Sequence, residues 1–281
     1  MAKLPIDPVN TTSSSQYYTY VTGGSWELTA VFESERYIPK AIKDGGVDPA
    51  MFEIGSRLGI APFVHGLVGY WKFDEGSGTT ANDSSGFGNN GALLDASSTS
   101  ADGNTPPQWT GGKVNHALDF DGDDDYVNVP NTPIFTPANN WSVSFWAKID
   151  PNQTNWQGVI HLKSGDAWGI YASHFSKAFL YTTEPGTGAT QPYFNSNPLS
   201  GLGSWIFYTL TKSGTIYKWH INGNLDSQQD KGAKDVTMNT GSTWQIGFDY
   251  SDRYKGLIDE VRVYNRALSA AEIKALYDAT K

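Results

Sequence analysis

Cysteine is missing from the 281-residue chain. No disulfide can therefore hold the fold together, and no thiol chemistry is available to it. A chain of this length can bury enough apolar surface to fold without such cross-links. The absence of cysteine leaves the redox compartment open.

Positive charge and long apolar runs are also scarce. The chain has 20 Lys and Arg against 29 Asp and Glu, a formal net charge of −9. Nucleic acid requires clustered Lys and Arg, so it is not an expected partner. No apolar run approaches the roughly 18 residues that a transmembrane helix needs, so no membrane insertion is expected. Met1-Ala2-Lys3 leads into a polar stretch without a signal peptide, and we expect an export segment to precede it in a longer protein.

Aromatic residues and turn formers are abundant, and from Gly66 onward they mark short strands at regular spacing. The segment 141–149 alternates strictly, which places Val143, Phe145, Ala147 and Ile149 on one face of a strand. The same reasoning places Trp146 and Lys148 on the opposite, outer face. Further strands are predicted at 67–73, 117–121, 126–129, 158–163, 168–172, 178–182, 206–212, 215–221, 243–248 and 256–264.

Many short strands without intervening helices indicate an all-β sandwich of antiparallel sheets. Asn222-Gly223 predicts a two-residue turn between two of these strands. The one convincing helix comes last, because Ser269 and Glu272 form a capping box ahead of an apolar stripe.

The first 62 residues differ in character. Short alternating runs at 17–21 and 26–33 flank a Gly-Gly turn and predict a β-hairpin, and a helical or loop piece is expected through Glu53–Leu58. The runs Asp7–Asn10, Tyr17–Tyr20 and Trp26–Glu33 make residues 1–62 similar to the C-terminal sheet region of type IV pilins and type II secretion pseudopilins. That resemblance implies a filament subunit whose N-terminal helix is absent from this sequence. A generic surface hairpin is the alternative.

Several segments of the remaining chain share their order and spacing with one family: 70–78, 83–91, 117–127, 141–146 and 256–269. Together they resemble the laminin-G-like, concanavalin A-like lectin/glucanase domain. The resemblance implies a jelly-roll β-sandwich with a short C-terminal helix over residues 67–281, after a linker at 63–66. Members bind glycans or proteins, and the fold alone does not determine which.

The same resemblance implies a structural Ca²⁺ where the first and last strands of the sandwich meet. Calcium takes six to eight oxygen ligands from carboxylates, carbonyls and water. Asp259 would supply one carboxylate, and the early loops would supply carbonyls or a second carboxylate. The alternative is that Asp259 is a strand-end residue bonded to loop amides. The candidate ligands are Asp259, Asp74, Asp83, Gly86 and Asn89.

The acidic run Asp119–Asp125 is a second place where a metal could be sought. It lacks the Asp-x-Asp-x-Asp-Gly loop with a distant Glu that marks an EF-hand. We interpret it as an acidic, solvated turn between two strands.

Catalytic motifs are absent from the sequence. Family-16 glycosidases share the fold and place a Glu-x-Asp-x-x-Glu pattern on one strand, for retaining hydrolysis by two carboxylates. This chain has no such pattern, no Gly-x-Ser-x-Gly, no phosphate loop and no His-Glu-x-x-His. We therefore predict that it is not an enzyme.

Glycan binding is the preferred chemistry, because sugar rings stack on aromatic side chains while polar groups hold their hydroxyls. The loop 182–201 is long and rich in Gly, Pro and Asn, which favours a functional role. The alternative is that most of the tryptophans pack in the core. The candidate ligand contacts are Trp156, His161, Asp166, Trp168, Tyr171, Tyr181 and Tyr193.

These observations predict a non-catalytic surface module, a pilin-associated adhesin domain that binds a glycan or a cell-surface protein outside a bacterial cell. Two alternatives stay open. The sandwich could make protein contacts in a filament that binds no glycan, or it could be the carbohydrate-binding accessory of a glycan-active protein. In this architecture one sheet is curved, so that its outer surface is a shallow concavity. An aromatic and polar cleft on that face would favour a glycan, whereas a flat, charged face would favour a structural role.

Overall fold

The protein is seen in a computed structural model that describes residues 18–22, 26–31, 51–55, 65–95, 105–130, 140–152, 156–163, 168–173, 177–183, 190–197, 203–232, 243–247 and 253–281. The chain forms two compact units. One comprises Met1–His65 with Ser269–Leu276, and the other comprises Gly66–Leu268 with Tyr277–Lys281. The predicted boundaries at residues 62 and 67 remain predictions.

The first unit contains a three-stranded antiparallel sheet in the order β1 (Tyr18–Thr22), β2 (Trp26–Val31), β3 (Met51–Gly55). Tyr18 pairs with Ala30, which confirms the predicted hairpin. The expectation of a helix or loop from Glu53 is wrong for residues 53–55, because β3 pairs with β2 along its length. A short strand of this kind gives too few alternating positions to be recognised. The remainder of that predicted segment, through Leu58, lies outside the described residues.

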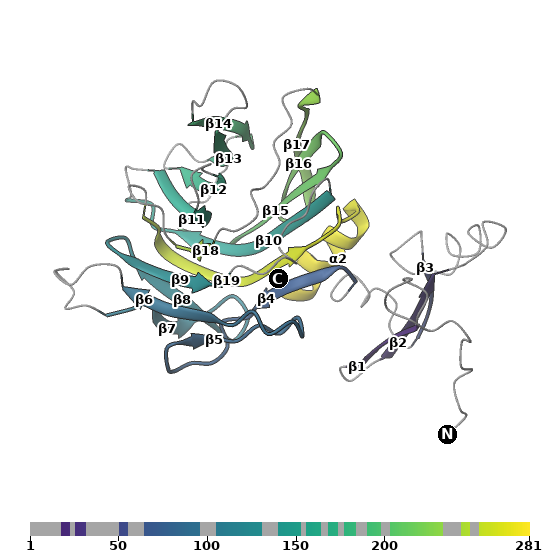
Figure 1. Cartoon of the computed structure of the whole chain (residues 1–281), viewed down its shortest axis with the longest axis horizontal. Coiled ribbons are helices and arrows are strands. Elements are labelled where there is room, and N and C mark those ends of the chain that lie inside the picture. The colour runs from purple at the N-terminus through teal and green to yellow at the C-terminus, as the bar shows by residue number, and fades with distance from the viewer. Residues whose placement is uncertain are drawn as a thin grey trace. The chain divides into compact units, whose positions relative to one another are not determined.

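The second unit is a sandwich of two antiparallel sheets (Figure 1), which confirms the predicted fold class. Sheet 1 has the order β17 (Asn224–Asp230), β16 (Ile216–Ile221), β15 (Ile206–Ser213), β10 (Asn140–Ile149), β19 (Lys255–Tyr264), β8 (His116–Asp121), β7 (Gln108–Gly111), with β4 (Leu67–Trp71) also paired to β19. Sheet 2 has the order β14 (Thr190–Asn195), β13 (Lys177–Thr183), β12 (Trp168–Ser173), β11 (Trp156–Lys163), β18 (Thr243–Ile246), β9 (Asp125–Val129), β6 (Gly91–Asp95), β5 (Thr80–Ala81).

The core lies between the sheets and is rich in aromatic residues. The predicted inward set of β10 is buried there, and Phe145 stacks on Tyr208 at 5.2 Å between ring centroids. Phe194 of sheet 2 stacks on Trp219 of sheet 1 at 6.5 Å. Strand alternation therefore decides which side chains of β10 face the core, as expected for a β-sandwich, although its outward residues Ser142, Ser144 and Trp146 are buried as well.

Turns and edge strands complete sheets 1 and 2. Asn222 and Gly223 have φ values of 50° and 78° and join β16 to β17, as predicted.

The segment 182–201 was expected to be a loop without secondary structure. That expectation is wrong, because β14 lies within it and pairs with β13.

The acidic turn joins β8 to β9, as predicted, but it is not fully solvated. Asp124 is 0% exposed and Asp125 is 4% exposed, so the expectation of a solvated turn is wrong for these two residues. The reason is topological, because β8 belongs to sheet 1 and β9 to sheet 2. The turn has to pass from one sheet to the other, and it takes these side chains out of solvent.

The final helix, α2 (Ala270–Thr280), begins at the predicted capping box. The Ser269 amide donates to Glu272 Oε2 at 2.7 Å, and the Glu272 amide donates to Ser269 Oγ at 3.3 Å. No helix in the part of the chain that the structure describes combines the length and apolar character of a membrane span.

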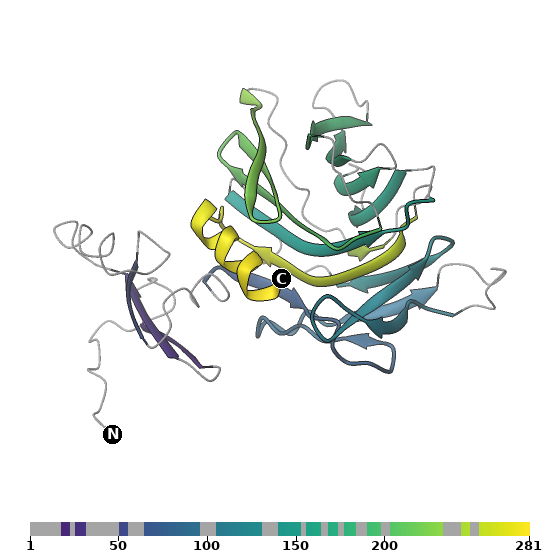
Figure 2. The same ribbon diagram turned by 180° about the vertical axis from the view of Figure 1, so that it is seen from behind.

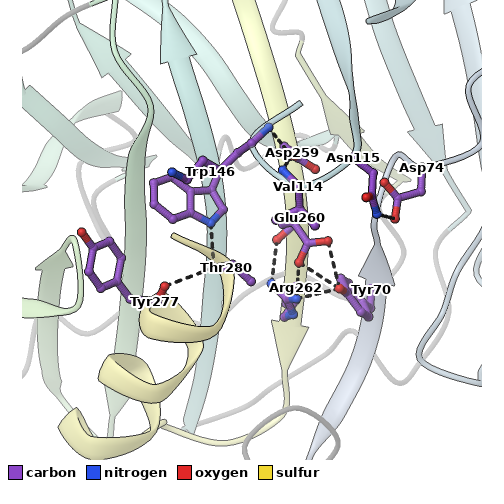
Figure 3. Close-up of polar contacts among 11 residues, drawn as sticks. Tyr70, Asp74, Val114, Asn115, Trp146, Asp259, Glu260, Arg262, Tyr277 and Thr280 are labelled. Atoms are coloured by element: carbon purple, nitrogen blue, oxygen red, sulfur yellow. Dashed lines mark hydrogen bonds and ion pairs between the residues drawn. The ribbon is translucent and has the colours of Figure 1, made fainter. Parts of the chain in front are cut away.

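The last turn of α2 buries Trp146. The indole of Trp146 donates from Nε1 to Thr280 Oγ1 at 2.9 Å, and its ring lies 5.7 Å from that of Tyr277 (Figure 3). Lys113 Nζ lies 4.7 Å from the Trp146 ring. Trp146 does lie on the face opposite the core, but its expected place on an open surface is wrong because the chain end covers it.

Candidate functional site

The backbone of β19 is irregular where it carries its charged residues. The pairing of β10 with β19 shifts register between Ser144 and Trp146, and Glu260 takes a φ of 57° at this bulge. A non-glycine residue in this region costs on the order of 1–3 kcal/mol, and such strain concentrates at functional sites. The bulge breaks the alternation of the strand at Asp259 and Glu260.

Asp259 is fully buried beside the turn formed by residues 112–116. Its Oδ2 accepts hydrogen bonds from the amides of Lys113 and Val114, both at 2.9 Å (Figure 3). Its Oδ1 accepts none from the described residues. Burial raises the pKa of Asp259 to about 8, against the lowering effect of the two amides. The loop-amide arrangement considered from the sequence is therefore present at one of the two oxygens.

Asp74 contacts the same turn from the other side. Its Oδ1 accepts from the His116 amide at 3.2 Å, and its Oδ2 accepts from Asn115 Nδ2 at 3.1 Å. Gly112 cannot be replaced here, because a Cβ would lie 2.2 Å from the His116 carbonyl oxygen and 2.8 Å from Asp259 Oδ2. The structure thus brings together Asp74 and Asp259, two of the five predicted calcium ligands.

Asp83 organises a different loop. Its Oδ1 accepts from the amides of Tyr70 and Ser85, and its Oδ2 accepts from Ser85 Oγ and the Asn89 amide, all within 2.9 Å. Burial opposes ionisation, but these hydrogen bonds outweigh it and lower the pKa of Asp83. Asn89 Nδ2 donates to the Val68 carbonyl at 3.1 Å, and Gly86 has a φ of 93°.

The five predicted ligands therefore form two groups: Asp74 with Asp259, and Asp83 with Gly86 and Asn89. Each oxygen of Asp83 already accepts two hydrogen bonds, which leaves it a poor metal ligand. Among the residues that the structure describes, no three or more His, Asp or Glu side chains are grouped to hold a metal ion. Oδ1 of Asp259 is the atom that could take a cation or a proton, and calcium there stays a prediction.

Glu260, Arg262 and Tyr70 form a buried ion-pair network that sequence reasoning missed (Figure 3). Arg262 Nη2 donates to Glu260 Oε2 and, at 2.6 Å, to the Tyr70 hydroxyl. The Tyr70 hydroxyl lies 3.0 and 2.9 Å from the two carboxylate oxygens of Glu260. Burial raises the pKa of Tyr70, which keeps its hydroxyl protonated as a donor. The sequence did contain a signal for this network, namely the charged run Asp-Glu-Val-Arg at residues 259–262 inside a largely apolar strand.

The candidate glycan contacts lie on sheet 2, where register separates them by face. Ile160 and Ile170 are paired core residues, so the neighbouring positions His161 and Gly169 belong to the outer face. Gly169 pairs with Tyr181, which extends this row. On the other side His161 pairs with Gln245, and Gln245 pairs with Asn128. We call this row of five paired positions the outer row: Asn128, Gln245, His161, Gly169 and Tyr181.

The other candidates occupy different positions. Tyr171 lies between Gly158 and Phe179 in the next row on the same face. Trp156 pairs with Ser173 at the far end of β11. Trp168 shares a row with Leu162 and with the core residue Trp244, so its register position is on the core face. Tyr193 falls at the register shift between β13 and β14, and Asp166 lies outside the described residues.

Two polar members of the outer row are buried although they face away from the core. His161 is 4% exposed and Gln245 is 2% exposed. Gln245 Oε1 accepts no hydrogen bond from the described residues. A buried acceptor without a donor costs about 1–3 kcal/mol, so such a group marks a place where another donor is expected. The sequence identified His161 but gave no signal for Gln245.

Comparison with known proteins supports the architecture. Residues 121–274, more than half of the chain, match the family model described as the concanavalin A-like lectin/glucanases superfamily. A search of curated proteins found no match. Domain 4 of AbnA, an extracellular arabinanase of Geobacillus stearothermophilus, is similar over 75% of this chain and 98% of its own, with 19% identity and a TM-score of 0.58.

Toxin binding domains are similar as well. The binding domain of Paraclostridial Mosquitocidal Protein 1 gives a TM-score of 0.60 at 14% identity, and the botulinum neurotoxin serotype D ligand binding domain gives 0.59 at 16%. Each match covers 76% of this chain, which spans about half the length of those chains (52% and 51%). At such low identity these likenesses establish the fold alone. With its family match and its two-sheet topology, the chain belongs to the concanavalin A-like lectin/glucanases superfamily.

Proposed function

We propose that the sandwich is a non-catalytic glycan-binding module that acts outside the cell, and that the outer row of sheet 2 is its binding surface. One observation carries the proposal: Gln245 Oε1 is buried and accepts no hydrogen bond from any residue that the structure describes. Gln245 pairs with His161 on the face of sheet 2 that points away from the core. Sugar hydroxyls are donors that can satisfy such an acceptor. Gly169 lies between His161 and Tyr181 in register, so no side chain separates these two positions of the row.

Two structures of similar fold add support. The AbnA domain was solved in complex with arabinotriose, and the serotype D toxin domain with N-acetylneuraminic acid. Those sugars were bound by the neighbours and do not identify the sugar for this chain. They favour a carbohydrate over the protein-contact alternative.

We expect the Gln245→Ala variant to bind its glycan about tenfold more weakly, which corresponds to the loss of one buried hydrogen bond. Tyr181→Ala, which removes a ring from the same row, is expected to weaken binding to a similar extent. The wild-type protein is first screened on a glycan array that includes arabino-oligosaccharides and sialylated glycans, and affinities for the best ligand are then measured by calorimetry.

Gln228→Ala is the matched control, because Gln228 is an exposed glutamine on β17 of the other sheet. Its affinity should equal that of the wild type. A folded wild-type protein that binds nothing on the array would contradict glycan binding and favour protein contacts. Unchanged binding by both outer-row variants would place the glycan elsewhere on the sandwich.

Assembly of residues 1–62 into a pilin-like filament is a further part of the proposal, and it rests on the sequence resemblance. If it holds, many copies of the sandwich would be displayed together, and weak single-site binding would gain avidity. Electron microscopy of the native protein tests it, because the absence of this chain from surface filaments would remove the pilin association.

A further inference from the structure

The outer face of sheet 2 carries a second set of side chains beside the outer row. In β9 the core residues are Val127 and Val129, so Tyr126 and Asn128 lie on the outer face. Asn128 already belongs to the outer row. Tyr126 lies two residues before it, about 7 Å along the same strand, and is half-buried. The outer row therefore has an aromatic neighbour at its β9 end.

The neighbouring strand β6 adds aliphatic side chains to the same face. Its core residue is Leu93, and Ala92 and Leu94 on either side of it are exposed. Ala92 pairs with Asn128, and Leu94 pairs with Tyr126. We call Ala92, Leu94 and Tyr126 the apolar patch.

The apolar patch is exposed directly beside polar groups. Leu94 is 38% exposed and is one of three large hydrophobic residues exposed in the described part of the chain, with Phe87 and Leu225. Single exposed apolar residues need no explanation, but contiguous ones rimmed by polar groups mark a binding surface. The patch adjoins the amides of Asn128 and Gln245, which pair with each other. This combination suits a sugar, whose C–H face stacks on a ring while its hydroxyls bond to amides.

The charge next to the apolar patch determines which sugars suit it. The run Asp121–Asp125 contains four aspartates and leads directly into β9, and Asp95 follows Leu94 at the end of β6. Arg253 is engaged there by Asp123, at 2.8 Å. Acidic side chains repel a carboxylate or sulfate group on a ligand. A neutral sugar avoids that repulsion.

We propose that the apolar patch is a further subsite of the glycan site and that it holds a neutral sugar ring stacked on Tyr126. The inference rests on the proposed function, because it extends the outer row. Neighbouring strands are spaced about 4.8 Å apart, so β9 and β11, on either side of β18, lie about 10 Å apart (Figure 1). One sugar ring cannot contact both Tyr126 and His161 over that span. The ligand is therefore a neutral oligosaccharide that crosses the strands of sheet 2.

The test takes the neutral series with the strongest array signal among arabino-, xylo- and cello-oligosaccharides and compares its disaccharide with its hexasaccharide by calorimetry. The wild-type protein should bind the hexasaccharide about tenfold more tightly than the disaccharide. Tyr126→Ala is expected to remove that difference, because it removes the ring on which the additional sugar stacks. Tyr126→Phe keeps the ring and should keep the wild-type affinity.

Leu94→Ala is a second variant at an exposed position, and it replaces Tyr126→Ala if that variant fails to fold by circular dichroism. It should weaken hexasaccharide binding about threefold. Leu225→Ala is the matched control, because Leu225 is exposed on β17 of sheet 1, and its affinity should equal that of the wild type. Oligogalacturonates and sialyllactose are the acidic probes, and both should bind more weakly than the neutral hexasaccharide.

The outcomes separate this inference from the proposed function. If Gln245→Ala weakens binding while Tyr126→Ala and Leu94→Ala keep the wild-type affinity for the hexasaccharide, the outer row stands and the further subsite is overturned. A preference of the wild type for the acidic probes overturns it as well. A folded wild-type protein that binds nothing on the array overturns both the inference and the proposed function.

Discussion

The Arg262→Leu variant is expected to lose about 3–5 kcal/mol of unfolding free energy, because it leaves the Glu260 carboxylate buried without its cation. Both side chains of the pair are only 3% exposed, so water cannot replace the missing partner. Because the pair is buried, removing one partner is strongly destabilising, although the intact pair contributes little net stability. Urea denaturation followed by tryptophan fluorescence measures the loss.

Two comparisons separate the unpaired charge from other effects of the substitution. The double variant Glu260→Gln/Arg262→Leu removes both charges and should be more stable than Arg262→Leu alone. Tyr70→Phe keeps the ion pair and removes one hydroxyl, so it should cost only about 1–2 kcal/mol. A loss below about 1 kcal/mol for Arg262→Leu would show that the ion pair is solvated in solution.

Asp259→Asn is expected to remove much of the pH dependence of stability between pH 4 and pH 8. The folded-state pKa of Asp259 is about 8, above an unfolded value of about 3.9. Within this window the folded state holds a proton that the unfolded state has released. Wild-type stability should therefore fall as pH rises, by up to about 1.4 kcal/mol per pH unit.

Asparagine cannot ionise, yet it keeps an acceptor for the amides of Lys113 and Val114. The variant should accordingly become more stable than the wild type as the pH approaches 8. Unfolding curves recorded in EDTA at pH 5, 6, 7 and 8 provide the measurement, and Asp123→Asn serves as a control for the loss of an exposed charge. Parallel stability curves for Asp259→Asn and wild type would mean that the Asp259 carboxylate titrates normally.

Local pattern was sufficient to predict the central strands and the final helix. Strict alternation identified β10 and its core face, and the Ser269–Glu272 box identified the start of α2. The edge strand β14 was missed because it follows a Gly- and Pro-rich stretch and itself contains Pro192, which edge positions tolerate. Edge strands have weaker apolar alternation than central ones.

The candidate site was harder to predict from the sequence, because pairing between strands that are distant in the chain decides which residues meet there. Tyr70 and Glu260 are 190 residues apart in the chain, and only the pairing of β4 with β19 brings them together. Alternation correctly assigned Trp146 to the outer face, but the position of Thr280 decided that it is buried. Asp124 likewise owes its burial to a change of sheet that the sequence of the turn does not reveal.

The place of β19 in sheet 1 has a consequence for the order of folding. This last strand, yellow in Figure 2, pairs with β10, β8 and β4, which are made long before it. Until Lys255–Tyr264 has been synthesised, those strands lack a shared neighbour and expose core residues. Such non-local pairing slows folding and exposes the nascent chain to aggregation. A chain that ended before Lys255 would lack a central strand of sheet 1, so truncation at this one point should prevent the whole sandwich from folding.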